Sequence, residues 1–239
     1  MKSSWVKLLF VAALAIAGPA HAQDAPAASQ TEAAVPAPAP PPAAPVVTAA
    51  EALGNPEYQL ALDLSTGGRV IVQLFPEVAP AHVERVKTLA RRGFYDGVVF
   101  HRVIEGFMAQ TGDPTATGEG GSDLPDLKAE FNATPHLRGT VSMARAAADD
   151  SANSQFFIMF LPRFSLDKKY TAFGRVVEGM QWVDRIARGE PAANPSRILQ
   201  ASVLADRKPP PAPGALPPSP AATPKEAPIT LDQLNAPRR

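Results

Sequence analysis

Arg102 belongs to the segment of this sequence best equipped for chemistry, Phe100-His-Arg-Val-Ile-Glu-Gly-Phe-Met-Ala-Gln110. If Phe107–Thr111 forms a strand, Met108 and Gln110 share one of its faces. A purely apolar core would then have to bury an amide beside a methionine, which is costly unless the amide finds a hydrogen-bonding partner. A lone arginine is typical of a surface ion pair, but its company with an amide and apolar side chains favours a functional role for Arg102.

Two later segments combine polar and apolar side chains in the same way. In Asn153-Ser-Gln-Phe-Phe-Ile158, a strand would place Gln155 beside Phe157 on one face and Phe156 on the other, toward the core. In Leu166-Asp-Lys-Lys-Tyr-Thr-Ala-Phe-Gly174, Leu166 and Tyr170 precede a glycine turn. The three segments therefore predict several short strands that present a mixed polar and apolar surface.

The elements that must position these residues are mostly strands. Tyr58–Leu64 and Arg69–Phe75 alternate apolar residues at period two and flank Ser65-Thr-Gly-Gly68, which predicts a hairpin. Six further strands are expected at Val98–Val103, Phe107–Thr111, Thr140–Ala144, Gln155–Phe160, Ala172–Val177 and Ile198–Ala205.

Two helices are expected among these strands. One begins at Pro80 and ends at Gly93, and the other covers Met180–Ala187 between two glycines. Eight short strands separated by Gly/Pro turns predict a mainly β fold, a closed eight-stranded antiparallel β-barrel capped by two α-helices.

Proline divides the chain of 239 residues, because 19 of its 27 prolines lie at or before Pro56 or at or after Pro209. Residues 1–22 carry two lysines, an apolar run and Ala20-His-Ala22, which predicts a signal peptide cleaved after Ala22. The apolar run is about 15 Å long as a helix, too short to span a bilayer. We therefore expect a disordered Ala/Pro-rich linker at 23–54, one domain at 55–208, a disordered proline-rich tail at 209–239, and a periplasmic or secreted protein without stable membrane insertion.

Composition excludes several classes of function. The 23 basic and 23 acidic residues form no basic stripe, so we expect no nucleic-acid partner. Cysteine is absent, which removes disulfides and thiolate chemistry. His82 is expected on a helix surface, His101 opposite Arg102 as a structural or rim residue, and His136 in a loop, so no metal site is predicted. Gly118-Glu-Gly-Gly121 lacks the lysine and hydroxyl of a phosphate loop and is read as a flexible turn.

The order of the motifs resembles that of the cyclophilins. The resemblance rests on Phe100-His-Arg-Val-Ile-x-Gly-Phe-Met-x-Gln, Ser142-Met-Ala, Ser154-Gln-Phe-Phe-Ile and Leu166-Asp-x-x-Tyr-Thr-x-Phe-Gly, and it runs from about Tyr58 to Ala205. It implies a peptidyl-prolyl cis-trans isomerase without a cofactor, acting on proline-containing polypeptide clients. It also implies the closed barrel and two helices that the element count predicts.

The same resemblance assigns roles to residues. Arg102 would be the catalytic cation and Gln110 a partner of the substrate backbone. A pocket for the proline ring would be formed by Phe107, Met108, Phe157 and Leu166. The rest of the peptide groove would be formed by Ala144, the main chain at Arg145, Gln155 and Tyr170. A guanidinium that donates to the prolyl nitrogen would favour the twisted amide, in which resonance is broken, without any covalent step.

Departures from the family pattern affect the rim of the groove. Ser165 stands where cyclosporin-sensitive members have Trp, so we expect weak binding of that drug. Tyr170 replaces the His, and Arg145 the Asn, of many eukaryotic members. The stretch between Gly112 and Arg138 is also shorter than in those members, which leaves contacts from this loop to the substrate open.

Two other functions stay open at the level of sequence. The groove could serve a chaperone or scaffold that binds proline-containing segments with little turnover. The proline-rich tails could present ligands to other domains or bind in the protein's own groove. We expect a monomer, acting on exported proteins that are still folding.

Overall fold

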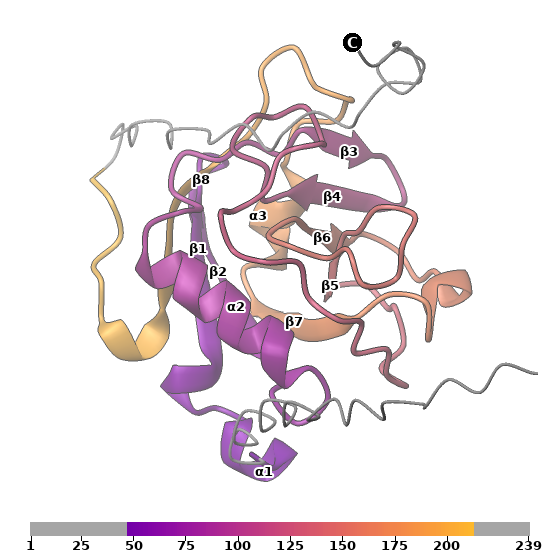
Figure 1. Ribbon diagram of the computed structural model, residues 1–239. Coiled ribbons are helices and arrows are strands. Elements are labelled where there is room, and N and C mark those ends of the chain that lie inside the picture. Colours follow the sequence, from indigo (N-terminus) through magenta and orange to yellow (C-terminus); the bar gives the residue numbers. More distant parts are fainter. Residues whose placement is uncertain (1–46, 213–239) are drawn as a thin grey trace, which may run out of the picture. The chain divides into compact units, whose positions relative to one another are not determined.

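The computed structural model describes residues 47–212 (Figure 1). Eight strands and three α-helices follow one another in this part of the chain. In chain order they are α1 Ala49–Ala52, β1 Gln59–Leu64, β2 Gly68–Leu74, α2 Pro80–Arg91, β3 Arg102–Ile104, β4 Met108–Thr111, β5 Thr140–Met143, β6 Phe156–Met159, β7 Ala172–Glu178, α3 Met180–Asp184 and β8 Ile198–Val203. Short 3-10 turns lie at Pro56–Tyr58, Phe164–Leu166 and Leu204–Asp206.

The eight strands form one antiparallel sheet in the order β3-β4-β6-β5-β7-β2-β1-β8. The predicted closed barrel is wrong, because the outermost strands β3 and β8 share no ladder. Only isolated bridges, Val99 with Arg197 and Val103 with Gly189, join the segments around them. In a closed barrel, the two edge strands would pair with each other. Here the connection that precedes β8 forms some of those backbone contacts instead, and the sheet is a curled half-barrel.

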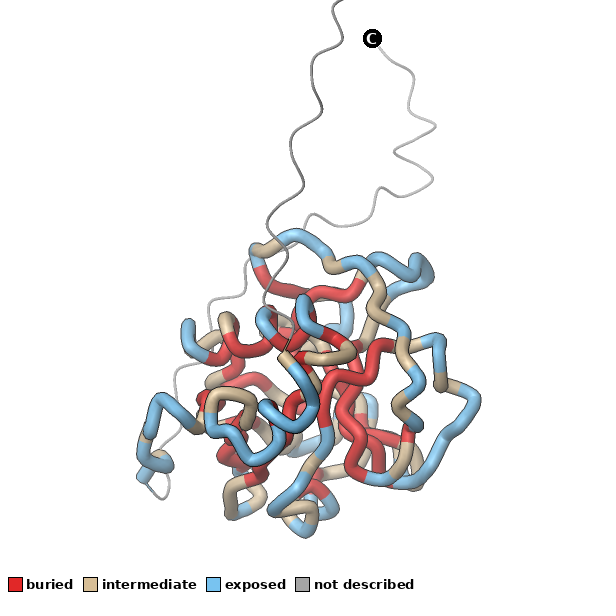
Figure 2. Tube along the Cα trace, turned by 90° about the horizontal axis from the view of Figure 1, so that it is seen from below, coloured by how far each residue is buried: buried red, intermediate tan, exposed pale blue. Residues whose placement is uncertain are grey.

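The main core lies inside the curl of the sheet. Leu60, Leu62 and Leu64 of β1 and Val70, Val72 and Leu74 of β2 are buried in it, as their alternation predicts. Helices α2 and α3 also contribute to this core. Helix α2 packs against β8 and α3 against β2, and Val86 of α2 and Val183 of α3 belong to the same cluster. Figure 2 shows the buried segments gathered in the middle of the described chain.

Helix α2 begins with Pro80 at its first turn, as predicted, and buries a stripe that includes Val83 and Leu89. The expectation that His82 lies on the helix surface is wrong. His82 is fully buried, and its Nδ1 atom lies 2.6 Å from Oε2 of Glu130. The loop that carries Glu130 covers this end of the helix, a long-range contact without any local signal in the sequence.

The two-helix cap needs a correction as well, because α1 is a third helix and lies within the segment predicted as linker. Thr48 caps α1 through a reciprocal hydrogen-bonding pair with Glu51. Gln73 of β2 then fixes the end of the segment, since its side chain accepts from Gly54 N and donates to Ala52 O. Ordered chain therefore begins at least seven residues before the predicted boundary at 55.

The predicted signal peptide, the linker as far as residue 46 and the tail from 213 lie outside the described residues. Within 47–212, no helix is both long and apolar enough to cross a bilayer.

Candidate active site

Strand pairing places Arg102, Gln110 and Phe157 in one row across three strands. Arg102 of β3 pairs with Gln110 of β4, which pairs in turn with Phe157 of β6. Directly opposed residues of antiparallel strands project from the same face. Met108 projects from this face too, whereas Ala109 and Phe156 point into the main core. The sheet therefore has a second apolar surface on its outer face.

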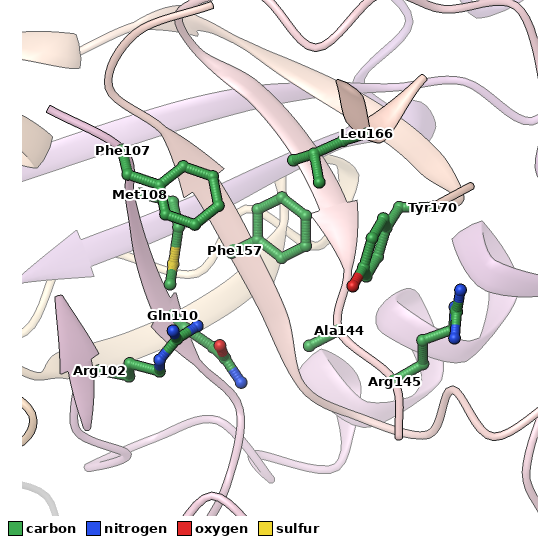
Figure 3. Close-up of a pocket in the computed structure, with 9 residues that line it drawn as sticks. All are labelled: Arg102, Phe107, Met108, Gln110, Ala144, Arg145, Phe157, Leu166 and Tyr170. Atoms are coloured by element: carbon green, nitrogen blue, oxygen red, sulfur yellow. The ribbon is translucent and has the colours of Figure 1, made fainter. Parts of the chain in front are cut away.

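A cavity of about 290 Å³ opens on this outer face. Nine of the ten site residues predicted from the sequence line it, namely Arg102, Phe107, Met108, Gln110, Ala144, Arg145, Phe157, Leu166 and Tyr170 (Figure 3). Figure 3 shows Arg102 and Gln110 along one side, with the apolar group of Phe107, Met108, Phe157 and Leu166 next to them. The cavity thus sets a cation and an amide beside an apolar surface.

The tenth predicted residue, Gln155, does not line the cavity but is hydrogen-bonded to Gln110 and orients it. Its Oε1 atom accepts a hydrogen bond of 2.9 Å from Nε2 of Gln110. Its own amide group donates to Gly118 O and Gly120 O at 2.9 and 2.8 Å. Both ends of the Gln155 amide are therefore engaged. Gln110 uses only one N–H in its contact with Gln155, so its carbonyl oxygen and its other N–H are left for a bound ligand.

Asp113 fixes the loop whose carbonyl groups accept hydrogen bonds from Gln155. Its buried carboxylate accepts hydrogen bonds from Thr115 N at 2.7 Å, Gly118 N at 2.6 Å and Gly120 N at 3.2 Å. Burial acts to raise the pKa of Asp113, but these hydrogen bonds, with that from the Thr115 hydroxyl, outweigh it and keep the pKa below its ordinary value. The predicted flexible turn at 118–121 is therefore fixed by a charged anchor.

The apolar side of the cavity depends on rings in contact. Phe157 meets Tyr170 edge to face, with centroids 5.8 Å apart, and stacks on His136 at 6.3 Å. His136 is fully buried and joins Ser142 Oγ at 3.1 Å to Asp167 Oδ1 at 2.8 Å through its two ring nitrogens. Hydrogen bonds and ring stacking therefore limit the positions available to the Phe157 ring.

Sequence reasoning missed the Ser142, His136 and Asp167 network, whose members lie up to 31 residues apart. The three side chains are connected like those of a hydrolytic triad. Ser142 and His136 are both fully buried, so a substrate carbonyl cannot reach the serine. The network supports the floor of the cavity.

Arg145 closes the far end of the cavity with its side chain engaged. Its guanidinium lies 4.9 Å from the Tyr170 ring centroid and 5.8 Å from that of Phe131. It also donates to Lys169 O and pairs with Asp149. The side chain thus serves as a wall, and the backbone at this position is what the groove can offer to a peptide.

His101 behaves as predicted for a structural residue. It is buried, and burial is the main cause that lowers its pKa, so the ring is neutral at neutral pH. Arg102, by contrast, has a half-exposed side chain that forms an ion pair with Glu190. Among residues 47–212, no group of three His, Asp or Glu side chains is placed to hold a metal ion.

Comparison with known proteins agrees with the geometry. Residues 61–203 match the family described as "Cyclophilin type peptidyl-prolyl cis-trans isomerase/CLD". The chain is 47% identical over 170 residues to a probable peptidyl-prolyl cis-trans isomerase of Brucella suis, covering 64% of this chain and 86% of that protein. It is 40% identical over 129 residues to peptidyl-prolyl cis-trans isomerase B of Bacillus subtilis, covering 53% and 89%.

Solved structures give the same result. A cyclophilin from Hirschia baltica superposes with a TM-score of 0.60 at 28% identity, covering 68% of this chain and 83% of that one. The crystal structure of a cyclophilin type isomerase from Cryptosporidium parvum in the presence of the dipeptide Ala-Pro gives 0.57 at 25% identity, covering 61% and 98%.

The curled half-barrel of eight antiparallel strands is the fold of the cyclophilins. The chain belongs to the cyclophilin type peptidyl-prolyl cis-trans isomerase family, and it is an enzyme of that class.

Proposed function

We propose that this enzyme accelerates rotation about X-Pro bonds in exported proteins during folding, with Arg102 as its catalytic residue and no cofactor. The observation that carries the proposal is the row of Arg102, Gln110 and Phe157, which sets a charged donor next to an apolar cavity. Uncatalysed prolyl isomerisation takes tens to hundreds of seconds, so an enzyme of this kind has work wherever proteins fold.

The substrate fits the site in one orientation. The proline ring enters the apolar side formed by Phe107, Met108, Phe157 and Leu166, while the backbone lies along Gln110 and Ala144. The relative from Cryptosporidium parvum, studied with Ala-Pro, supports a proline-containing peptide as the ligand. The main chain of Arg145 and the Tyr170 side chain complete the groove.

Arg102 acts on the amide that rotates. The barrier of about 18–20 kcal/mol comes from amide resonance, which holds the prolyl nitrogen planar. As the bond twists, the lone pair of that nitrogen is no longer shared with the carbonyl group, and it can accept a hydrogen bond from a guanidinium N–H. The donor therefore interacts more strongly with the transition state than with the planar substrate, which is the condition for catalysis.

Isomerisation of a short X-Pro peptide by wild type, Arg102→Ala and Arg163→Ala tests this mechanism. Arg163 is a matched control, because its guanidinium lies 4.9 Å from the Phe107 ring centroid but does not line the cavity. We expect Arg102→Ala to lower kcat/KM by about 100- to 1000-fold, as for loss of one transition-state donor. The control should stay within about threefold of wild type. If the folded wild-type protein does not accelerate isomerisation, the result would instead support a chaperone or scaffold that binds proline-containing segments.

The predicted signal peptide supports export, with clients that fold after translocation. Cell fractionation followed by N-terminal sequencing tests this part. The expected result is a periplasmic or secreted chain that begins at Gln23. A cytoplasmic chain that retains residues 1–22 would contradict it.

A further inference from the structure

The segment that precedes the described domain is chemically suited to the enzyme's own cavity. Residues 23–46 contain seven prolines, and four of them form Ala-Pro steps, at 25–26, 37–38, 39–40 and 44–45. We infer that this segment is an intramolecular ligand and substrate, which occupies the cavity part of the time and competes with clients. The inference rests on the proposed function, because it needs a cavity that accepts proline.

The chain is long enough for this contact. From Pro26 to Val47, the first described residue, an extended chain of 21 residues reaches up to about 70 Å. A compact domain of about 165 residues is about 40 Å across. The Ala-Pro step at 25–26 can therefore reach any side of the domain.

Charge favours this segment over the C-terminal one. Residues 23–46 carry Asp24 and Glu32 and no basic residue, whereas residues 213–239 carry three basic and two acidic residues. At the cavity, Arg102 and Arg145 are each paired with a carboxylate, but Arg163, over the Phe107 ring, forms no ion pair with any residue of 47–212. This uncompensated cation beside the apolar side of the cavity attracts an acidic segment.

Weak intrinsic affinity is sufficient because the segment is tethered. A tether of this length gives an effective concentration on the order of 1 mM. A segment with a dissociation constant of about 1 mM would then occupy about half of the cavities in a dilute solution, whatever the protein concentration. A client must displace it, so the apparent KM for a short peptide rises about twofold with kcat unchanged.

The test uses the chain without its predicted signal peptide and two variants with seven proline-to-alanine substitutions each. The first variant carries Pro26→Ala, Pro36→Ala, Pro38→Ala, Pro40→Ala, Pro41→Ala, Pro42→Ala and Pro45→Ala. The matched control carries Pro213→Ala, Pro217→Ala, Pro218→Ala, Pro220→Ala, Pro224→Ala, Pro228→Ala and Pro237→Ala. Both keep the length and charge of the chain, and neither changes the described domain.

We expect the first variant to lower the apparent KM about twofold and to shift the methyl NMR signals of Met108 and Ala144, while the control does neither. Exchange spectroscopy should also show cis-trans exchange at Ala25-Pro26 at least 100-fold faster than in the Arg102→Ala chain, at a rate independent of protein concentration. Equal effects of the two variants, or no shift of the cavity signals, would overturn the inference. A rate proportional to concentration would also overturn it, since it would mean contact between copies.

Failure of the proposed function gives a different result from failure of this inference. If the enzyme does not accelerate isomerisation of a separate peptide, the proposed function fails, and the methyl shifts still decide whether the segment binds. If it does accelerate that reaction and the seven substitutions at 23–46 move neither KM nor the methyl signals, only the inference fails.

Discussion

The Nε atom of Arg102 lies 3.6 Å from Oε1 of Glu190. Backbone pairing holds the two residues at this distance, because Val103 N donates to Gly189 O at 2.8 Å and Gly189 N donates back to Val103 O at 3.0 Å. Glu190 therefore faces the Nε edge of the guanidinium and leaves the terminal amino groups for a bound amide. The ion pair orients the residue that we propose as catalytic.

Glu190→Gln is expected to lower kcat/KM by about two- to fivefold, mainly through kcat. The effect is small because both side chains are about half exposed, and exposed ion pairs are worth about 0.2–1 kcal/mol. Glu105→Gln is the matched control, since Glu105 pairs with Arg188 and not with Arg102. Peptide isomerisation at low salt measures both. Equal losses in the two variants would refute a specific role for Glu190.

Gln155→Ala is expected to lower kcat/KM by about five- to tenfold, because Gln110 loses the partner that fixes its amide. The loss of hydrogen bonds to Gly118 O and Gly120 O should cost about 1–2 kcal/mol of stability. Kinetics and urea unfolding of the same samples separate the two effects.

Gln73→Ala provides the matched comparison for Gln155. Gln73 donates to Ala52 O and Tyr58 O, far along the sheet from the cavity strands. The Gln73→Ala variant should lose about as much stability as Gln155→Ala and keep the kcat/KM of wild type. If both glutamine variants lose activity equally, the loss at Gln155 reflects general destabilisation.

Asp113 gives the protein a predictable sensitivity to acid. Its pKa in the folded state is held below the ordinary value of about 3.9 by hydrogen bonds to its carboxylate. The stabilisation is therefore complete above the unfolded-state pKa and is lost as the pH falls through about 4 toward the folded-state pKa. Urea midpoints measured between pH 6 and pH 3 should fall, and Asp113→Asn should make that fall shallower.

Other carboxylates limit how far Asp113→Asn can flatten the curve. Glu130 and Asp167 also have lowered pKa values through hydrogen bonds from His82 and His136, against the opposing effect of burial. Each contributes in the same range of pH. An Asp113→Asn curve as steep as that of wild type would show that the Asp113 carboxylate contributes nothing in this range.

Much of the sheet could be predicted from period-two alternation, which identified the β1–β2 hairpin and the inward faces of both strands. The predicted strand at Val98–Val103 was less accurate, since β3 covers only Arg102–Ile104. Closure of the barrel could not be derived from alternation, because it depends on how the connection before β8 pairs with Val103. Local patterns carry no information about that contact.

The residues that line the cavity could be predicted because they come from short, distinctive motifs. Nine predicted residues line one cavity, and the awkward pairing of Met108 with Gln110 is explained by an outer face that is apolar but is not the main core. The supporting residues His136 and Asp113 were not recognised as such. Their roles come from hydrogen bonds between segments, which a single sequence does not reveal.

Neighbouring phenylalanines test the division of the sheet into two faces. Phe156 is fully buried in the main core, where its ring meets Tyr95 at 5.5 Å and Phe173 at 6.1 Å. Phe157 lies on the opposite face and lines the cavity. Alanine at these two positions should therefore give opposite patterns of stability and activity.

Phe156→Ala should cost about 3–5 kcal/mol of unfolding free energy, because it leaves a cavity in a closed core. Phe157→Ala should cost about 1.5–3 kcal/mol, since it widens a cavity that is already open, and it should lower kcat/KM by ten- to a hundredfold. Urea unfolding and peptide isomerisation at low temperature, where both proteins are folded, measure the two quantities. Phe156→Leu replaces Phe156→Ala if the latter does not fold. Loss of activity at 156 equal to that at 157, in folded protein, would mean that the two faces are not functionally separate.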